Sequence, residues 1–509
     1  MRAWRLPALL LVPGLIVAAA VVERRGLGPE RAAGTAEAVE VPMPAAAAPG
    51  AASSTFFCAG GTATGSDDGA AEHTVVVANG SGEPRRGRLT AYPSEGAVAS
   101  REFDLPPHAR VDLVVSELVR APHAAALVEL DGGEVAVQHE LSGPTGRATG
   151  ACASAPATSW YFPSGTTRPG TRMILSVFNP FPGSAVLDIV FETEDGTTRR
   201  PQQYESLVVP GASLVALDVT DVVTLREELF TTVVARSGRV VVDQIQTSDG
   251  SEGSPRGLSV TLGAPAPATA WVFPDGIGAL GYGERIVVAN PADRIAEVDV
   301  QVLLDDPERN GVAEPFEVSI GAGSYEVVDV FADGRVPPGV AHQIVVRSRN
   351  GVAVVAQRVV TGGADAAQPG LSATIGSPGV ATRWLVPVGS VEAASGAAVI
   401  VSNPSATGTA TVVLRVLAGG RYEVVQGLDG VVIEAGGRRV IDLGTDALGL
   451  RPLALEVGSD RPVTVESRFG FAEGDDFSYL VAVPVLGSLG APVDLVGTLS
   501  SETIVVGGG

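Results

Sequence analysis

Apolar and polar residues alternate along most of the chain, and short turns rich in Gly and Pro interrupt the alternation. A period near two is typical of strands that bury one face. Stretches long enough for the helices of a parallel βαβ arrangement are hard to find. The pattern therefore predicts an all-β protein made of β-sandwiches. Between residues 269 and 381 it predicts strands at 271–273, 285–289, 297–303, 316–320, 325–328, 343–347, 352–358 and 371–375.

The strands belong to a unit that recurs along the chain, and such periodicity organises a fold. The motif Trp-x-x-Pro-x-Gly begins at Trp160, Trp271 and Trp384, and a more divergent copy begins at Phe56. In the three closer copies an Asn follows the Trp by 19 residues and an Asp follows it by 58. In the first copy the corresponding separations from Phe56 are 23 and 56 residues. These landmarks are Asn79, Asn179, Asn290 and Asn403, and Asp112, Asp218, Asp329 and Asp442.

The motif divides the chain into repeat 1 (residues 54–157), repeat 2 (158–268), repeat 3 (269–381) and repeat 4 with a C-terminal tail (382–509). We expect each repeat to fold as an immunoglobulin- or fibronectin-like β-sandwich. Because the last strand of one copy leads directly into the next motif, we expect neighbouring sandwiches to stack as a semi-rigid rod.

Each landmark has a structural interpretation. The Trp is expected to pack in a core or between repeats; a sugar-stacking role, which needs an exposed ring, stays open. The three later Asn residues precede Pro, which ends strand pairing. The Asp suits a helix N-cap. A polar position also recurs at Gln138, Gln244, Gln357 and Ser467, which indicates either buried hydrogen bonding or a repeated ligand contact.

The start of the chain carries the signature of export. Arg2 and Arg5 precede an apolar run at residues 6–22, which is near the lower length limit for crossing a bilayer. Residues 1–25 are therefore a signal anchor or a cleavable signal peptide. Residues 26–53, rich in Ala and Pro, are predicted to form a flexible tether. We expect a single-pass cell-membrane protein with an extracellular C-terminal part, or a secreted protein if the signal is cleaved.

The chain has two cysteines, Cys58 and Cys152, and both lie in repeat 1. In an exported protein a disulfide is the natural interpretation. Metal or redox chemistry is the alternative, but it calls for more ligands or a C-x-x-C spacing. Cys152 stands eight residues before Trp160, where the later copies carry Gly263 and Gly376.

Charge and motif content argue against several functions. A net charge of −22 does not suit nucleic acid, because phosphate binding needs a basic face. Glycines at 276–281 match a dinucleotide pattern, but a strand follows them where a helix is needed. No nucleophile elbow or metal-type histidine spacing occurs. We predict no catalytic residue, no cofactor and no metal, although the loop with Asp305, Asp306, Glu308 and Asn310 leaves a calcium site open against a plain hairpin turn.

The Trp-x-x-Pro-x-Gly strand, the Asn-Pro turn and the strand ending in Asp, behind an anchor and tether, resemble an actinobacterial exported family catalogued as domain of unknown function 5719. The resemblance covers about residues 50 to 490, and repeat 1 departs from it at Phe56 and Ala59. It implies an envelope protein, exported or membrane-anchored, and supplies no catalytic residues. We expect a non-enzymatic spacer or a binding surface for an envelope protein or a glycan. The alternatives are an accessory scaffold subunit of a membrane-bound envelope-biogenesis enzyme and an unrecognised glycan-active enzyme.

Overall fold

The computed structural model describes residues 41–64, 71–276, 278–305, 313–337, 339–388, 396–418, 420–443, 454–471, 476–492 and 494–496. Over these residues the fold is all-β, which confirms the predicted class, and its helical elements are the 3-10 turns η1 (Val115–Glu117) and η2 (Gln202–Tyr204). No helix in this part of the chain is long and apolar enough to cross a membrane. The predicted membrane segment at residues 6–22 lies outside the described residues.

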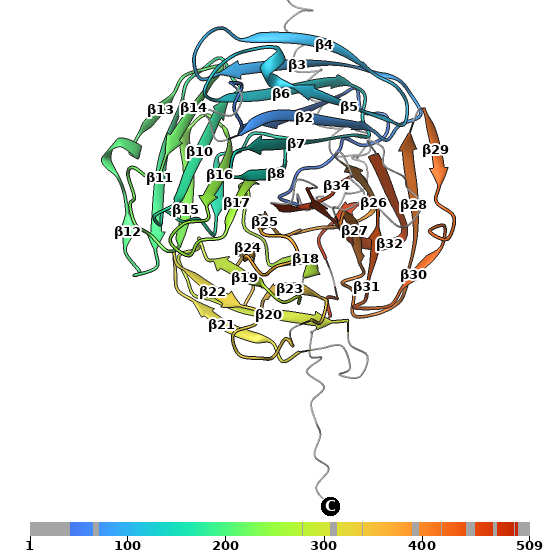
Figure 1. Cartoon of the computed structure of the whole chain (residues 1–509). Coiled ribbons are helices and arrows are strands. Elements are labelled where there is room, and N and C mark those ends of the chain that lie inside the picture. The colour runs from blue at the N-terminus through green and yellow to red at the C-terminus, as the bar shows by residue number, and fades with distance from the viewer. Residues whose placement is uncertain are drawn as a thin grey trace, which may run out of the picture. The chain divides into compact units, whose positions relative to one another are not determined.

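Repeats 1 and 2 are each built from two antiparallel sheets (Figure 1). Repeat 1 has the sheets β1-β6-β3-β4 and β5-β2-β7-β8, and repeat 2 has β14-β10-β16-β17 and β12-β11-β15-β9, with β13 added to β11. The strands are β1 (Ser53–Cys58), β2 (Glu72–Asn79), β3 (Arg85–Pro93), β4 (Ala99–Leu105), β5 (Ala109–Val114), β6 (Ala124–Asp131), β7 (Val135–Gly143), β8 (Gly146–Ala151), β9 (Ser159–Phe162), β10 (Thr171–Asn179), β11 (Ala185–Thr193), β12 (Thr198–Arg199), β13 (Leu207–Val209), β14 (Ser213–Asp218), β15 (Leu229–Ser237), β16 (Val241–Asp249) and β17 (Arg256–Leu262).

Repeat 3 follows the same plan, with the sheets β18-β23-β20-β21 and β22-β19-β24-β25. In repeat 4 the long strand β32 pairs with β26 and β28 along its first part and with β27 and β33 along its second, so one larger sheet results. The strands are β18 (Ala270–Gly276), β19 (Tyr282–Ala289), β20 (Ala296–Leu304), β21 (Phe316–Ile320), β22 (Tyr325–Asp329), β23 (His342–Ser348), β24 (Val355–Gly362), β25 (Gly370–Ile375), β26 (Val380–Pro387), β27 (Ala398–Ser402), β28 (Ala410–Ala418), β29 (Arg421–Val424), β30 (Val431–Ile433), β31 (Arg438–Asp442), β32 (Ala454–Gly470), β33 (Phe477–Val481), β34 (Val483–Pro484) and β35 (Leu489–Gly490).

Every strand predicted between residues 269 and 381 is present, and one of them is displaced along the chain. The prediction placed a strand at 352–358, whereas β24 runs from Val355 to Gly362. The reason is that Val354 pairs with Ala268, before β18, instead of with β19. The alternation of apolar and polar residues predicts which face of this segment is buried. That face is the same whether the segment pairs with the residues before β18 or with β19.

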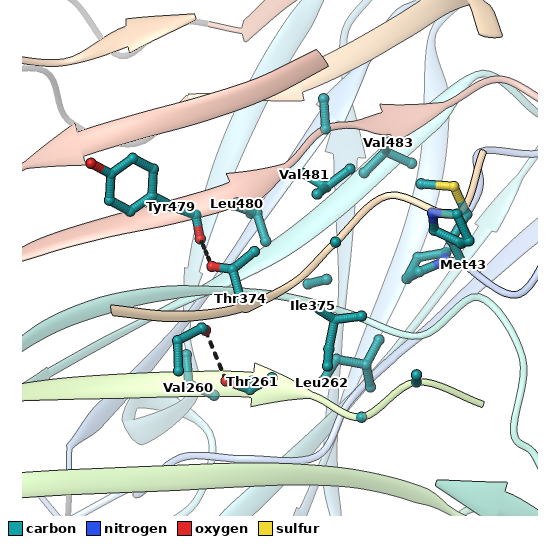
Figure 2. Close-up of a pocket in the computed structure, with 18 of the residues that line it drawn as sticks. Met43, Val260, Thr261, Leu262, Thr374, Ile375, Tyr479, Leu480, Val481 and Val483 are labelled. Carbon is teal, nitrogen blue, oxygen red and sulfur yellow. Dashed lines mark hydrogen bonds between the residues drawn. The ribbon is translucent and has the colours of Figure 1, made fainter. Parts of the chain in front are cut away.

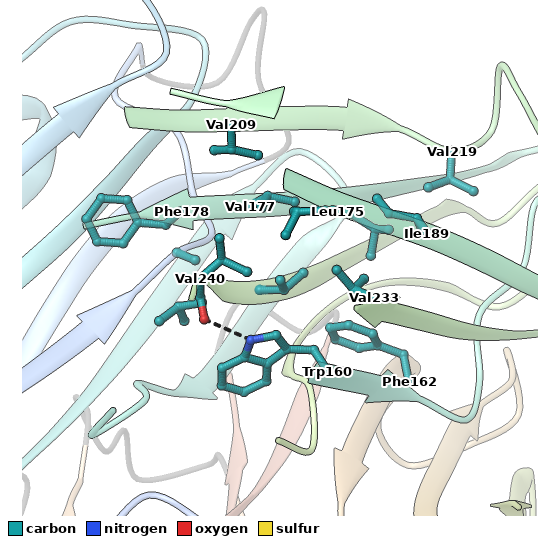
Figure 3. Packing of buried hydrophobic residues seen from close by; sticks show 14 of the residues in the cluster. Trp160, Phe162, Leu175, Val177, Phe178, Ile189, Val209, Val219, Val233 and Val240 are labelled. Carbon is teal, nitrogen blue, oxygen red and sulfur yellow. Dashed lines mark hydrogen bonds between the residues drawn. The ribbon is translucent and has the colours of Figure 1, made fainter. Parts of the chain in front are cut away.

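Each repeat has its own main hydrophobic core. In repeat 2, Leu175, Ile189 and Val233 from three strands belong to the same buried cluster as Trp160, which is 1% exposed (Figure 3). The indole N–H of Trp160 donates a hydrogen bond to the Val240 carbonyl at 2.9 Å. A buried Trp therefore fills the core with its ring while its one polar atom stays paired.

The repeats contact one another in succession, and the succession returns to its beginning. The last strands of the four repeats meet as β8 with β17, β17 with β25, β25 with β33, and β33 with β8. Between repeats 4 and 1, the Thr149 N–H donates to Ser478 Oγ at 3.0 Å and Arg383 pairs with Glu134. The expected linear rod is therefore wrong for the described residues between 41 and 496, since the ends of a rod do not touch.

Candidate functional site

The recurring polar position lies at the contacts between repeats, and the register shows which residues occupy it. The structure pairs Gln138, Asp243, Gln357 and Glu466 with the residue three before the landmark Asn of the same repeat. The sequence comparison placed Gln138 and Gln357 correctly, but Gln244 and Ser467 stand one residue beyond the equivalent place. In a strand, that shift moves a side chain to the opposite face.

Three of these four side chains accept backbone N–H groups from the preceding repeat. Asp243 Oδ2 accepts from Ala59 at 2.8 Å and Gly60 at 2.7 Å. Gln357 Oε1 accepts from Ser164 at 2.9 Å. Glu466 Oε2 accepts from Asp275 at 3.0 Å. In each case the donors lie at the end of the first strand of one repeat or just beyond it, so this position fixes how consecutive repeats fit together.

The landmark Trp residues have equivalent environments, in which all three are buried. The indole of Trp271 donates to the Val354 carbonyl at 2.8 Å, and that of Trp384 donates to the Val463 carbonyl at 3.1 Å. Phe56 is buried in the core of repeat 1. A stacking platform for sugars needs an exposed ring, so none of these four residues can provide one.

The landmark Asn residues are buried as well, and each joins three stretches of backbone. In repeat 3, Asn290 Nδ2 donates to the carbonyls of Arg294 at 2.8 Å and Ile320 at 3.0 Å, and its Oδ1 accepts the Ala292 N–H at 3.1 Å. The same pattern holds in the other repeats through Asn79, Asn179 and Asn403.

Asp218, Asp329 and Asp442 each end a strand, and Asp218 and Asp329 form turns, whereas Asp112 lies inside β5. Oδ1 of Asp218 accepts the Thr220 N–H, and Oδ1 of Asp329 accepts the Phe331 N–H, both at 3.0 Å. Among the described residues no α-helix follows them, so a turn replaces the expected N-cap. Asp218, Asp329 and Asp442 each pair with the residue five positions before the landmark Asn of the same repeat. Asp112 pairs with the residue three positions before its Asn, so it is shifted by two residues from this register.

The expected disulfide joins Cys58 to Cys152 and is fully buried. It replaces a contact between Gly and Phe that repeats 2 and 3 use. A Cβ built on Gly263 would come within 2.7 Å of the Phe162 ring, so only Gly fits beneath that ring. Repeat 1 has the two cysteines at these places, which explains why the second Cys aligns with a Gly.

A cavity of about 320 Å³, lined by both polar and apolar side chains, lies between repeats 2 and 3. Glu228 pairs with Arg285 across it at 2.7 Å, and Arg168 pairs with Glu227 at 3.1 Å, so its charges balance. Burial raises the pKa of Glu228, although Arg285 opposes the shift. None of the described residues that line the cavity is aromatic. The polar side chains in its wall include Ser164, Thr166, Gln244, Gln246, Ser248 and Ser259.

Between repeats 3 and 4 a cluster of charges is closed off from solvent. Arg358 pairs with Glu466 at 2.6 Å, and Arg438 pairs with Asp275 at 2.6 Å. Burial raises the pKa of Glu466 to about 7, with Arg358 opposing. Burial acts upward on Asp275 too, but Arg468 and Arg438 hold its pKa below the ordinary value. Carboxyl groups with divergent pKa values suit acid–base work, but these two are at most 2% exposed.

Between repeats 1 and 2 two histidines and an acid are buried together. His73 Nε2 lies 3.1 Å from His139 Nδ1, and His139 Nε2 lies 3.8 Å from Asp243 Oδ2. Burial lowers the pKa of His73 to about 4, holds that of His139 well below its usual value, and raises that of Asp243 to about 7. Burial thus favours the uncharged form of each group, and the cluster is a structural contact.

A second, smaller cavity of about 70 Å³ lies where the last strands of the repeats meet (Figure 2). Its wall is mainly apolar, with Leu262, Ile375 and Val481 among the labelled side chains, and Thr374 Oγ1 donates to the Tyr479 carbonyl at 2.6 Å. Met43 also lines it. Residues 41–52, which fall in the range assigned to the tether, thus include packed positions, and no sequence pattern indicates this contact.

Over the described residues no group of three His, Cys, Asp or Glu is placed to hold a metal ion. Most of the calcium candidate loop, at 306–312, lies outside the described residues. So do Asp67, Asp68, Glu473 and Asp475 and the C-terminal residues 497–509. The dinucleotide-like glycines lead into strand β19, as expected for a loop.

Comparison with known proteins identifies a matching family but no curated relative of known function. Residues 134–383 match a family of unknown function (DUF5719), which confirms the resemblance noted from the motifs over that range. No curated protein matches the chain. A Thermotoga maritima 1070 structure is 25% identical, with 22% of this chain and 93% of that chain covered and a TM-score of 0.19. The Anabaena sensory rhodopsin transducer is 20% identical over 18% of this chain and 96% of its own, with a TM-score of 0.16.

Proposed function

We propose that this chain, whose residues 134–383 match the family of unknown function DUF5719, is a non-enzymatic, exported cell-envelope protein that acts as a rigid binding surface. In this proposal each pair of sheets is an immunoglobulin- or fibronectin-like β-sandwich. Residues 1–25 anchor the chain in the membrane or direct its secretion, and a short tether holds the repeats outside. The binding partner is an envelope protein or a glycan.

The observation that carries the export half of the proposal is the buried disulfide between Cys58 and Cys152. Structural disulfides form and persist in oxidising compartments outside the cytosol. The N-terminal apolar run at residues 6–22 is consistent with the same destination.

The binding half of the proposal is supported by how the repeats are joined. Backbone N–H groups of one repeat bond to Asp243, Gln357 or Glu466 of the next, and the pair Arg358–Glu466 is enclosed. Directional buried contacts of this kind hold neighbouring units at a defined angle. Rigid neighbours can present a site made from two repeats, because little ordering is then lost on binding.

The proposal is tested in intact cells that express the full chain. A protease that does not cross membranes should degrade the repeats, and thiol alkylation after denaturation should find Cys58 and Cys152 blocked. A matched chain without residues 1–25 should stay protected from the protease. Repeats that remain protected in the full chain, together with free thiols, would refute export.

A further inference from the structure

The cavity between repeats 2 and 3 is polar at a place where the preceding contact is apolar. In repeat 1, Leu141 pairs with Ala148 across β7 and β8, and in repeat 2 the equivalent pair is Gln246 and Ser259 across β16 and β17. Leu141 and Ala148 belong to a closed apolar cluster with Ile245 of the next repeat. Gln246 and Ser259 instead line the cavity.

The contact between repeats 3 and 4 is filled at the same place. Val360 of β24 pairs with Ser372, in the position that Gln246 holds in repeat 2. It packs against Phe477 and Tyr479 of repeat 4. Among the described residues, the contacts between repeats 1 and 2 and between repeats 3 and 4 are thus packed at this position. The contact between repeats 2 and 3 has a cavity there, with polar side chains in its wall.

Two polar atoms in this wall have no partner. Gln244 Oε1 and Ser248 Oγ are buried and make no hydrogen bond to any described residue. A buried polar atom without a partner costs about 1 to 3 kcal/mol. Apolar side chains at these places would avoid that cost, so the retained polar atoms indicate a ligand that supplies hydrogen bonds.

The wall also defines the ligand's chemistry. Its two acidic and two basic groups are paired with each other, Glu228 with Arg285 and Glu227 with Arg168. The wall therefore has no excess charge that would attract a charged ligand. Most of the other lining residues carry hydroxyl or amide groups, which can both donate and accept, and Val327, Val359 and Leu371 add apolar surface. The volume of about 320 Å³ is at the lower end for small-molecule pockets and accommodates a single sugar ring.

We infer that the cavity between repeats 2 and 3 binds one uncharged, hydroxyl-rich sugar unit. This inference rests on the proposed binding function and gives its ligand class. Its test is separate, because protease accessibility in cells measures export and the binding experiment measures the site. Absence of sugar binding with normal export would overturn the site alone.

The experiment uses the purified full chain in a detergent without a sugar headgroup, with saturation-transfer NMR and calorimetry. The probes are glucose, galactose, mannose, arabinose and N-acetylglucosamine, with glucuronic acid as the charged counterpart. Ser248→Ala removes one unpartnered hydroxyl, and Gln246→Leu with Ser259→Ala copies the pair found in repeat 1. Ser176→Ala is the matched control, because Ser176 is also buried with an unpartnered Oγ but does not line the cavity.

We expect at least one uncharged sugar to bind, Ser248→Ala to weaken its Kd by about fivefold to tenfold, the double variant to abolish binding, and Ser176→Ala to leave it unchanged. Circular dichroism checks folding; if the double variant does not fold, the comparison of Ser248→Ala with Ser176→Ala decides. The inference fails if no uncharged sugar binds, if glucuronic acid binds more tightly than the uncharged probes, or if Ser248→Ala binds like the wild type.

Discussion

Replacing Asn179 tests whether the landmark asparagines hold the strand ends of each repeat together. Its Nδ2 donates to the carbonyls of Gly183 at 2.8 Å, Pro210 at 3.0 Å and Val209 at 3.2 Å, and its Oδ1 accepts the Phe181 N–H at 3.1 Å. An amide has two hydrogens, so the three carbonyls share two strong bonds, and the side chain contributes the equivalent of three hydrogen bonds.

At about 1 kcal/mol of net stabilisation per hydrogen bond, Asn179→Ala should lower the free energy of unfolding of repeat 2 by about 3 kcal/mol. Asn179→Asp keeps the shape and the acceptor, but it places a carboxyl oxygen against carbonyl oxygens in a site that is 1% exposed. We therefore expect Asn179→Asp to be destabilised more than Asn179→Ala, although it is the more conservative change in volume.

Hydrogen exchange followed by mass spectrometry measures this effect within repeat 2, in peptides covering β10 and β11. The matched control is Asn350→Ala, because Asn350 makes similar hydrogen bonds to Ile295 and Val352 but is exposed, and we expect a loss under about 1 kcal/mol there. If Asn179→Asp exchanged as slowly as the wild type, the hydrogen-bond argument for the landmark Asn would be wrong.

Three further predictions concern buried groups. Because Asp243 has a folded pKa of about 7 against an ordinary 3.8, its contribution to stability is present below about pH 4 and is lost as pH rises toward 7. Between pH 4 and 7 the free energy of unfolding of Asp243→Asn should therefore rise by up to about 4 kcal/mol relative to that of the wild type, as measured in denaturant titrations. A difference between the two proteins that did not change with pH would contradict this. Replacing both Cys58 and Cys152 by Ala should destabilise repeat 1 by about 4 kcal/mol, read from its exchange rates, whereas unchanged rates would show that the cross-link contributes nothing. Arg358→Met should lower the free energy of unfolding by about 3 to 5 kcal/mol, because it leaves the buried Glu466 carboxyl without its ion-pair partner. Adding Glu466→Gln should restore part of this stability in thermal melts. If it did not, Arg358 would stabilise the protein by packing and not by its ion pair.

The strands and the disulfide could be predicted because each depends on local or compositional information. A half-buried strand shows its alternation over a few residues, as 316–320 does, and the structure has that strand at Phe316–Ile320. Two cysteines in the whole chain leave a single possible intramolecular pair. The limit of this reasoning shows at Gln244 and Ser467, where one-residue errors of alignment hid Asp243 and Glu466 as the residues that join the repeats.

The amino-acid sequence alone was sufficient for the all-β class, the repeated unit, the family resemblance and the pairing of Cys58 with Cys152. Only the tertiary structure decided that repeat 4 contacts repeat 1, that Met43 packs against the last strands, and that Gln246 faces a hollow while Leu141 faces a packed wall. The physical reason is that hydrophobic period reports which face of a strand is buried, but not what covers it. That depends on the register of pairing and on the neighbouring repeat, which lies about a hundred residues away in the chain.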